Sequence, residues 1–182
     1  MSESRLGQLK TLMQKSTGGA YRSVWSLAAA TYGARPDDES TLPTGYDPHL
    51  VALFEAMLGA AILVAHADGH FDDVERRALE QVVHSLGAGS LPRGQVATLV
   101  EDFEADLARD GFERRVELVI DAVMRPDFAR ELLRMATVVA LASHDVSTEE
   151  RSLLERFAVG MGLDAADVDA VIVEARAACV VL

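Results

Sequence analysis

Six side chains that can bind a metal or move a proton lie within ten residues of the sequence: His66, Asp68, His70, Asp72, Asp73 and Glu75. A twelve-residue calcium loop starting at Val64 would place Asp68 at position five, Gly69 at the required glycine and Glu75 at the bidentate position twelve. Positions one and three are not carboxylates. The spacing therefore predicts a weak, oxygen-rich site for calcium or magnesium, centred on Asp68, and no intact EF-hand.

The same stretch also has a purely structural interpretation. Asp72 and Glu75 have the spacing of a capping box at a helix N-terminus, and Gly69 supplies a positive φ. Asp68 can accept hydrogen bonds from backbone amides of the turn. A metal-free helical scaffold or adaptor domain therefore stays open as an alternative.

Few residues outside this turn favour an enzyme. The dipeptide His144-Asp145 is typical of metal-dependent HD phosphohydrolases, for which His66, His84 and Asp121 would be the further ligands. A two-residue motif arises readily by chance. The sequence contains no GxSxG, HExxH or CxxC motif and no glycine-rich phosphate loop. We therefore predict a protein that is not an enzyme, with the hydrolase as the alternative.

Composition predicts the all-α class. Of 182 residues, 49% are hydrophobic, 25% are charged and only 5% are aromatic, and alanine, leucine and valine dominate. One cysteine and an N-terminus without a signal pattern predict a cytoplasmic protein. The longest apolar stretch is too short to span a bilayer, so no transmembrane segment is expected. Arginine outnumbers lysine 15 to 2, which suggests a bacterial source.

The net charge of −12 is unevenly distributed. Residues 1–35 carry about +4 and the remaining residues about −16. The acidic part has no basic stripe that could neutralise phosphates, which argues against nucleic acid as a partner. A cation or a basic protein is the expected partner.

Hydrophobic periodicity divides the chain into an extension and a main domain. Residues 3–15 and 20–32 are predicted helices, and residues 33–47 are a linker rich in proline, glycine and acids. We place the domain boundary between residues 1–46 and 47–182. Caps, glycines and prolines in the second part predict helices over 48–67, 73–86, 93–109, 112–124, 127–143, 148–161 and 165–178.

An internal repeat appears when the chain is compared with itself at an offset of 75 residues. AHADGHFDDVERRALE, from Ala65, aligns with ALASHDVSTEERSLLE, from Ala140. Each half therefore contains an apolar helix, an acidic turn and a capped amphipathic helix. Two such halves would pack their apolar faces together, which predicts a pseudo-two-fold bundle of about seven helices with a helical N-terminal extension.

These two units, the FEADLARDG segment at Phe103–Gly111 and the closing GLD at Gly162–Asp164 resemble the TerB family of tellurite-resistance proteins. The resemblance implies a non-enzymatic, cytoplasmic protein of the tellurite and chemical-stress response. It also implies protein partners linked to the membrane, so that the protein would sit peripherally at the inner face. The family's metal-binding acidic positions fall on Asp68, Asp72, Asp73 and Glu75 in the first turn and on Asp145, Glu149 and Glu150 in the second.

The second turn departs from the family pattern, because Ser143-His144 replaces the usual Asp-Gly. The N-terminal extension lies outside the resemblance. Its positive charge and its stripe of Leu6, Leu9, Leu12 and Met13 predict an amphipathic attachment that docks on the acidic body, a partner or an anionic membrane. A helix packed permanently on the core is the alternative.

Overall fold

The computed structural model describes residues 24–33, 47–69, 71, 73–86, 91–123, 125–143 and 145–180. Across these residues the regular structure is helical and contains no strand, so the predicted all-α class is confirmed. The helices are α2 (Val24–Gly33), α3 (Pro48–Ala65), α4 (Asp73–Leu86), α5 (Arg93–Asp110), α6 (Phe112–Ala122), α7 (Pro126–Ser143), α8 (Thr148–Gly160) and α9 (Ala165–Val180). The predicted helix at 3–15 and most of the predicted linker lie outside the described residues.

Helix starts follow the predicted caps. Asp47 caps α3 by accepting a 2.9 Å hydrogen bond from the His49 amide, with proline at the first helical position. At α8 the capping box is complete: Ser147 accepts from the Glu150 amide and Glu150 accepts from the Ser147 amide, at 3.1 and 2.7 Å. Local side-chain chemistry therefore sets these boundaries.

Two helices end two residues earlier than predicted: α3 ends at Ala65 and not at residue 67, and α6 ends at Ala122 and not at residue 124. The segment expected to stay helical to Met124 leaves the helix after Ala122, because Val123 adopts an extended conformation (φ −105°, ψ 97°). Its side chain is only 8% exposed and joins the hydrophobic core. Burial of an apolar side chain outweighs continuation of the helix at this position.

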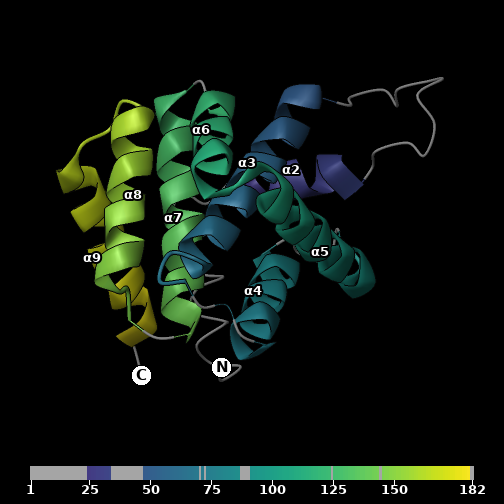
Figure 1. Cartoon of the computed structure of the whole chain (residues 1–182). Helices are drawn as coiled ribbons and strands as arrows, with labels where there is room; N and C mark the ends of the chain where they lie inside the picture. Colours follow the sequence, from purple (N-terminus) through teal and green to yellow (C-terminus); the bar gives the residue numbers. More distant parts are fainter. Residues whose placement is uncertain are drawn as a thin grey trace.

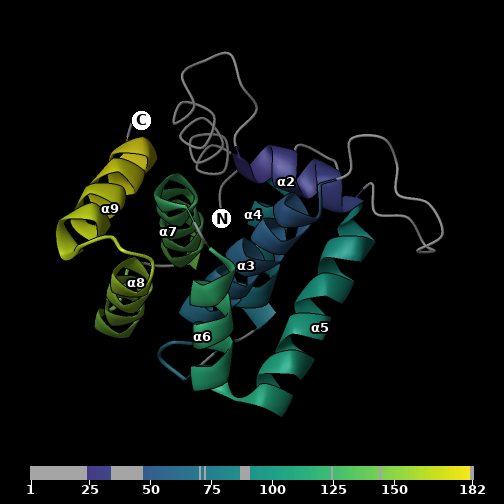
Figure 2. The same ribbon diagram turned by 90° about the horizontal axis from the view of Figure 1, so that it is seen from above.

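Helix α3 lies at the centre of the molecule and packs most extensively against α7 (Figures 1 and 2). It is buried along almost its whole length, from Val51 to Val64. Helix α2 packs on α3 as well, with Ala28 and Ala29 fully buried and the Tyr32 ring 4.8 Å from that of Phe54. Residues 24–33 are therefore a packed part of the fold, and the predicted attachment can concern only residues 1–23, which the structure does not describe.

The predicted pseudo-symmetry is present in the order of the helices. Helices α3, α4 and α5 form one half, α7, α8 and α9 form the other, and α6 connects them. The offset of 75 places Asp73, the first residue of α4, on Thr148, the first residue of α8. The repeat in the sequence is therefore a repeat in the structure.

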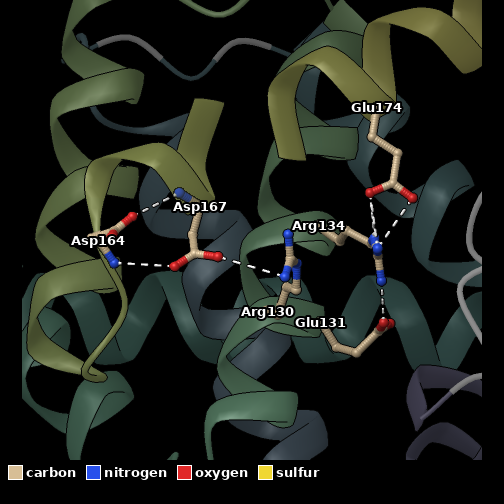
Figure 3. Close-up of polar contacts among 6 residues, drawn as sticks. All are labelled: Arg130, Glu131, Arg134, Asp164, Asp167 and Glu174. Carbon is tan, nitrogen blue, oxygen red and sulfur yellow. Dashed lines mark hydrogen bonds and ion pairs between the residues drawn. The ribbon is translucent and has the colours of Figure 1, made fainter. Parts of the chain in front are cut away.

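Ion pairs bind α9 to α7 in the second half (Figure 3). Arg134 of α7, only 11% exposed, contacts Glu131 at 2.6 Å on its own helix and Glu174 at 2.8 Å on α9. Arg130, one turn earlier, lies 3.6 Å from Asp167 of α9. Burial lowers the pKa of Arg134, but hydrogen bonds and charges from both glutamates outweigh burial and hold that pKa above its ordinary value. The guanidinium therefore stays charged within this contact.

The end of α8 approaches α6 closely. A Cβ atom added at Gly160 would lie 2.6 Å from Cδ1 and 2.9 Å from Cγ2 of Ile120. No other side chain fits here without displacing Ile120. By contrast, Gly94 in α5 has open space around the same position.

We expect Gly160→Ala to destabilise the protein and Gly94→Ala to stabilise it. Overpacking typically costs about 1–3 kcal/mol, whereas alanine in place of glycine within a helix gains up to about 1 kcal/mol. Urea unfolding of the two variants and the wild type measures both effects. Equal effects of the two substitutions would show that the contact between α8 and α6 is not tight.

Candidate functional site

The first acidic turn is held against α5 by a group of stacked and charged side chains. His66 ends α3, and its ring lies 4.5 Å from that of Phe71. The Arg76 guanidinium lies 5.7 Å from the Phe71 ring centroid and 2.5 Å from Glu104 of α5. His66 Nε2 is 3.9 Å from the other oxygen of Glu104. Two of the basic groups at this turn therefore face a carboxylate of the protein itself.

The predicted ligands of the first turn are only partly described. Asp68 and Asp73 are exposed to solvent. His70, Asp72 and the side chain of Glu75 lie outside the described residues, so the first capping box and the predicted cation site stay predictions. Gly69 has a φ of +82°, as predicted for this turn.

The acids of the second turn have structural partners. Asp145 accepts a hydrogen bond from the Val146 amide at 3.0 Å and pairs with Arg176 of α9 at 2.8 Å. Glu150 belongs to the capping box of α8, and Glu149 is exposed. A cation at this turn would have to compete with an arginine and with a helix cap for its ligands.

Two arginines that the sequence analysis did not single out join neighbouring helices within each half in the same way. Arg76 and Arg151 occupy equivalent positions of the repeat, 75 residues apart. Arg76 reaches Glu104 on the following helix α5, and Arg151 reaches Asp169 on the following helix α9 at 2.5 Å. The Glu-Arg dipeptide that recurs in both turns was the signal that could have revealed these arginines.

No three histidine, cysteine, aspartate or glutamate side chains gather as metal ligands in the part of the chain that the structure describes. His66, His84, Asp121 and Asp145, four of the HD-type candidates, fall within that part. His84 instead lies 3.0 Å from the Leu91 carbonyl oxygen. The described residues thus give the hydrolase alternative no support.

The two acidic turns lie close together, around a hollow of about 390 Å³. Ala67 of the first turn and Glu149 of the second line it together. At its edge, Arg156 of α8 donates two hydrogen bonds to Glu113 of α6, at 3.1 and 2.7 Å. These hydrogen bonds, followed by the positive charge of Arg156, hold the pKa of Glu113 below its ordinary range.

A second hollow, a groove of about 360 Å³, opens between α5 and α6 above α3. The two helices diverge from their connection at Gly111 (Figure 2). Apolar and aromatic side chains form much of its lining, and charged groups join them: Tyr32, Ala52, Glu55, Ala56, Leu99, Asp102, Phe103, Asp106, Arg115, Leu118, Val119 and Ala122. Ala52, Asp102 and Ala122 are exposed, so the groove is accessible to solvent.

Charge in the groove is mainly negative. Glu55, Asp102 and Asp106 contribute carboxylates, and Arg115 contributes the one cation among the lining residues. The Arg115 guanidinium lies 5.4 Å from the Phe103 ring centroid and 3.3 Å from Asp106. Because Arg115 is already paired, the groove combines an apolar lining with a net acidic edge.

The repeat relates the groove to a covered face in the other half. On α7, Arg130 and Arg134 pair with α9. The equivalent positions on α3 are Glu55 and Gly59, and Glu55 lines the groove together with its neighbours Ala52 and Ala56. Helix α5 contacts α3 far less than α9 contacts α7. The groove is thus the face of α3 whose counterpart on α7 is covered by a helix.

At Gly59 the absence of a side chain allows α5 and α6 to approach α3 closely. A Cβ atom there would lie 3.2 Å from the Phe103 ring and 3.3 Å from Val119. Fold and site together define a helical domain of two similar halves with an accessible groove in one of them.

The chain belongs to the TerB family. The family model described as tellurite resistance protein TerB matches residues 54–172, which span α3 to α9. The predicted family is thereby confirmed. No curated protein and no solved structure gave a match to the chain.

The contacts of the first turn predict that Arg76 stabilises the fold while its neighbour Arg77 does not. Arg76→Ala removes the pair with Glu104 and the contact with Phe71, for an expected loss of about 1–2 kcal/mol. Arg77 is exposed, and Arg77→Ala should change stability by less than about 0.5 kcal/mol. Chemical denaturation measures both, and a neutral Arg76→Ala would mean that the turn is not fixed by α5.

Proposed function

We propose that this TerB-family protein is a non-enzymatic interaction module of the tellurite and chemical-stress response, and that it binds protein partners through the groove between α5 and α6. The groove carries the proposal: it is accessible, lined by the aromatic side chains of Tyr32 and Phe103, and acidic at its edge. Aromatic side chains at the centre of a concave surface are typical of binding hot spots.

A helix is the shape of partner that fits this surface. Amphipathic helices commonly bind apolar grooves between helices through side chains at spacings of three and four residues. The equivalent face of α7 accommodates a helix within the same molecule. The binding mode is therefore already used once in this fold.

Net charge and burial are consistent with a protein partner. A net charge of −12 disfavours nucleic acid. Helix α3 is the only helix among the described residues long and apolar enough to cross a membrane, and 67% of it is buried inside the protein. We propose a cytoplasmic protein that reaches the inner face of the membrane through its partners.

A weak site for calcium or magnesium at the first turn is a second candidate function. It is supported by the exposure of Asp68 and Asp73 to solvent. Asp72 and Glu75 would supply the further carboxylates. A set of oxygen ligands without carboxylates at positions one and three gives an expected Kd of about 10⁻⁴ M or weaker.

The groove can be tested by photo-crosslinking in cells. Benzoylphenylalanine placed at position 122, at the edge of the groove, is expected to yield an adduct with a discrete protein partner. The same residue placed at position 170, on the exposed surface of α9, should not. Leu118→Glu, which puts a charge in the groove, should remove the adduct while leaving the melting temperature nearly unchanged. Equal adducts from positions 122 and 170 would contradict the proposal.

The cation site can be tested by thermal unfolding. Calcium or magnesium at a hundred times the Kd should raise the free energy of unfolding by about 2.7 kcal/mol. Asp68→Ala should abolish this increase. Asp145→Ala should lower stability without the cation, through loss of the Arg176 pair, yet keep the increase. If neither cation raises the melting temperature of the wild type, the turn is metal-free and the protein is an interaction module alone.

A further inference from the structure

The charges around the groove indicate the charge of the segment that would cover it. The second half of the molecule, where a helix covers the corresponding face, serves as the comparison. There the floor helix α7 contributes Arg130 and Arg134, and the covering helix α9 contributes Asp167 and Glu174 (Figure 3). In the first half the position equivalent to Arg130 is Glu55. The lining of the groove carries three carboxylates, Glu55, Asp102 and Asp106, against the one guanidinium of Arg115, so a helix that covers it should be basic.

We propose that residues 3–15 of this chain bind in the groove as an amphipathic helix, in the place that α9 takes in the other half. This inference rests on the proposed function of the groove as a binding surface. A partner would then have to displace the chain's own N-terminal segment. The groove would be self-occupied in the absence of a partner and open in its presence.

The composition of the segment matches the groove. Leu6, Leu9, Leu12 and Met13 recur at helical spacing, and the same stretch carries the bases Arg5, Lys10 and Lys15 with Glu3 as its only acid. The groove offers Tyr32, Leu99, Phe103, Leu118 and Val119 to the apolar stripe, and its net negative edge, with the exposed Asp102, to the bases. The domain at residues 47–182 carries 12 bases against 25 acids, and this basic amphipathic segment complements that charge.

The volume of the groove is large enough for such side chains. At about 30 Å³ per water molecule, 360 Å³ corresponds to roughly a dozen waters. Leucine side chains that displace these waters remove apolar surface from solvent, at about 25 cal/mol per Å². The free energy of docking thus comes mainly from the leucine stripe, while the charges set its orientation.

The connection is long enough to reach. Residues 16–23, which include Gly18-Gly19, link the segment to the start of α2. Eight residues span up to about 26 Å when extended. Helix α2 has 10 residues, about 15 Å, and its penultimate residue Tyr32 lines the groove. A tether of this length gives an effective concentration near millimolar, at which even weak docking is populated.

The decisive experiment uses the purified full-length protein alone. Benzoylphenylalanine at position 122 should form an intramolecular crosslink to residues 3–15, identified by mass spectrometry in the monomer. The same residue at position 170 is the control and should not reach this segment. Leu9→Gln combined with Leu12→Gln should reduce the crosslink at least tenfold, while Thr11→Gln, off the apolar stripe, should leave it unchanged.

Two further readouts separate this inference from the proposed function. A mixture of unlabelled and ¹⁵N-labelled protein detects a crosslink between two copies. A crosslinked product of mixed mass, in place of the intramolecular product, would overturn binding within the chain. Amide resonances of residues 99–106 and 115–122 should shift in the Leu9→Gln, Leu12→Gln variant, and unchanged resonances would also overturn the inference. A protein partner captured in cells at position 122, without an intramolecular crosslink, would leave the proposed function standing and refute only self-occupancy.

Discussion

The burial of α3 is the constraint on which the other helices depend. Apart from Glu55 this helix is apolar beyond its first turn, and its buried residues extend over more than three turns from Val51 to Val64. Such a helix must be largely surrounded by other elements, because each exposed side would leave apolar surface in water. Helix α7 covers it most extensively, and α2, α6, α4, α5 and α8 cover the remainder (Figure 2). The covering is thinnest where α5 diverges from α6, and the groove lies there.

The two halves differ in the contacts that cover their central helices, α7 and α3. On α7 the long side chain of Arg134 reaches α9 and is neutralised by Glu174, so a charge is buried with its partner. On α3 the equivalent residue is Gly59, next to which the Phe103 ring of α5 lies close to the backbone. Helix α5 nevertheless packs on α3 much less than α9 packs on α7. The face of α3 beside α5 is therefore less covered than the face of α7 beside α9.

Local patterns in the sequence predict the helices well and their charged contacts poorly. Asp47-Pro48 and the Ser147-Glu150 box act within a few residues of themselves, and both were predictable for that reason. The carboxylate of Asp145, which is predicted as a metal ligand, accepts a hydrogen bond from Arg176, 31 residues away. The spacing of residues within a turn shows where carboxylates lie close together. It does not show which arginine from a distant part of the sequence pairs with them. Periodicity did not predict the groove, but the repeat shows that Glu55 and Gly59 of α3 stand where Arg130 and Arg134 of α7 stand.

Charge distribution decides what kind of binding this fold can support. Many of the described arginines, such as Arg76, Arg134, Arg151 and Arg156, are paired with carboxylates of neighbouring helices. Acids outnumber bases in the domain, so carboxylates remain after these pairs and create a negative field around the groove. Such a field attracts basic segments over about 8 Å at physiological salt, but exposed charges add little affinity once contact is made. Affinity must then come from apolar side chains entering the groove. Charge therefore determines which partners approach this surface, and contacts with leucine and aromatic side chains determine how tightly they bind. One basic amphipathic helix can then replace another in the groove.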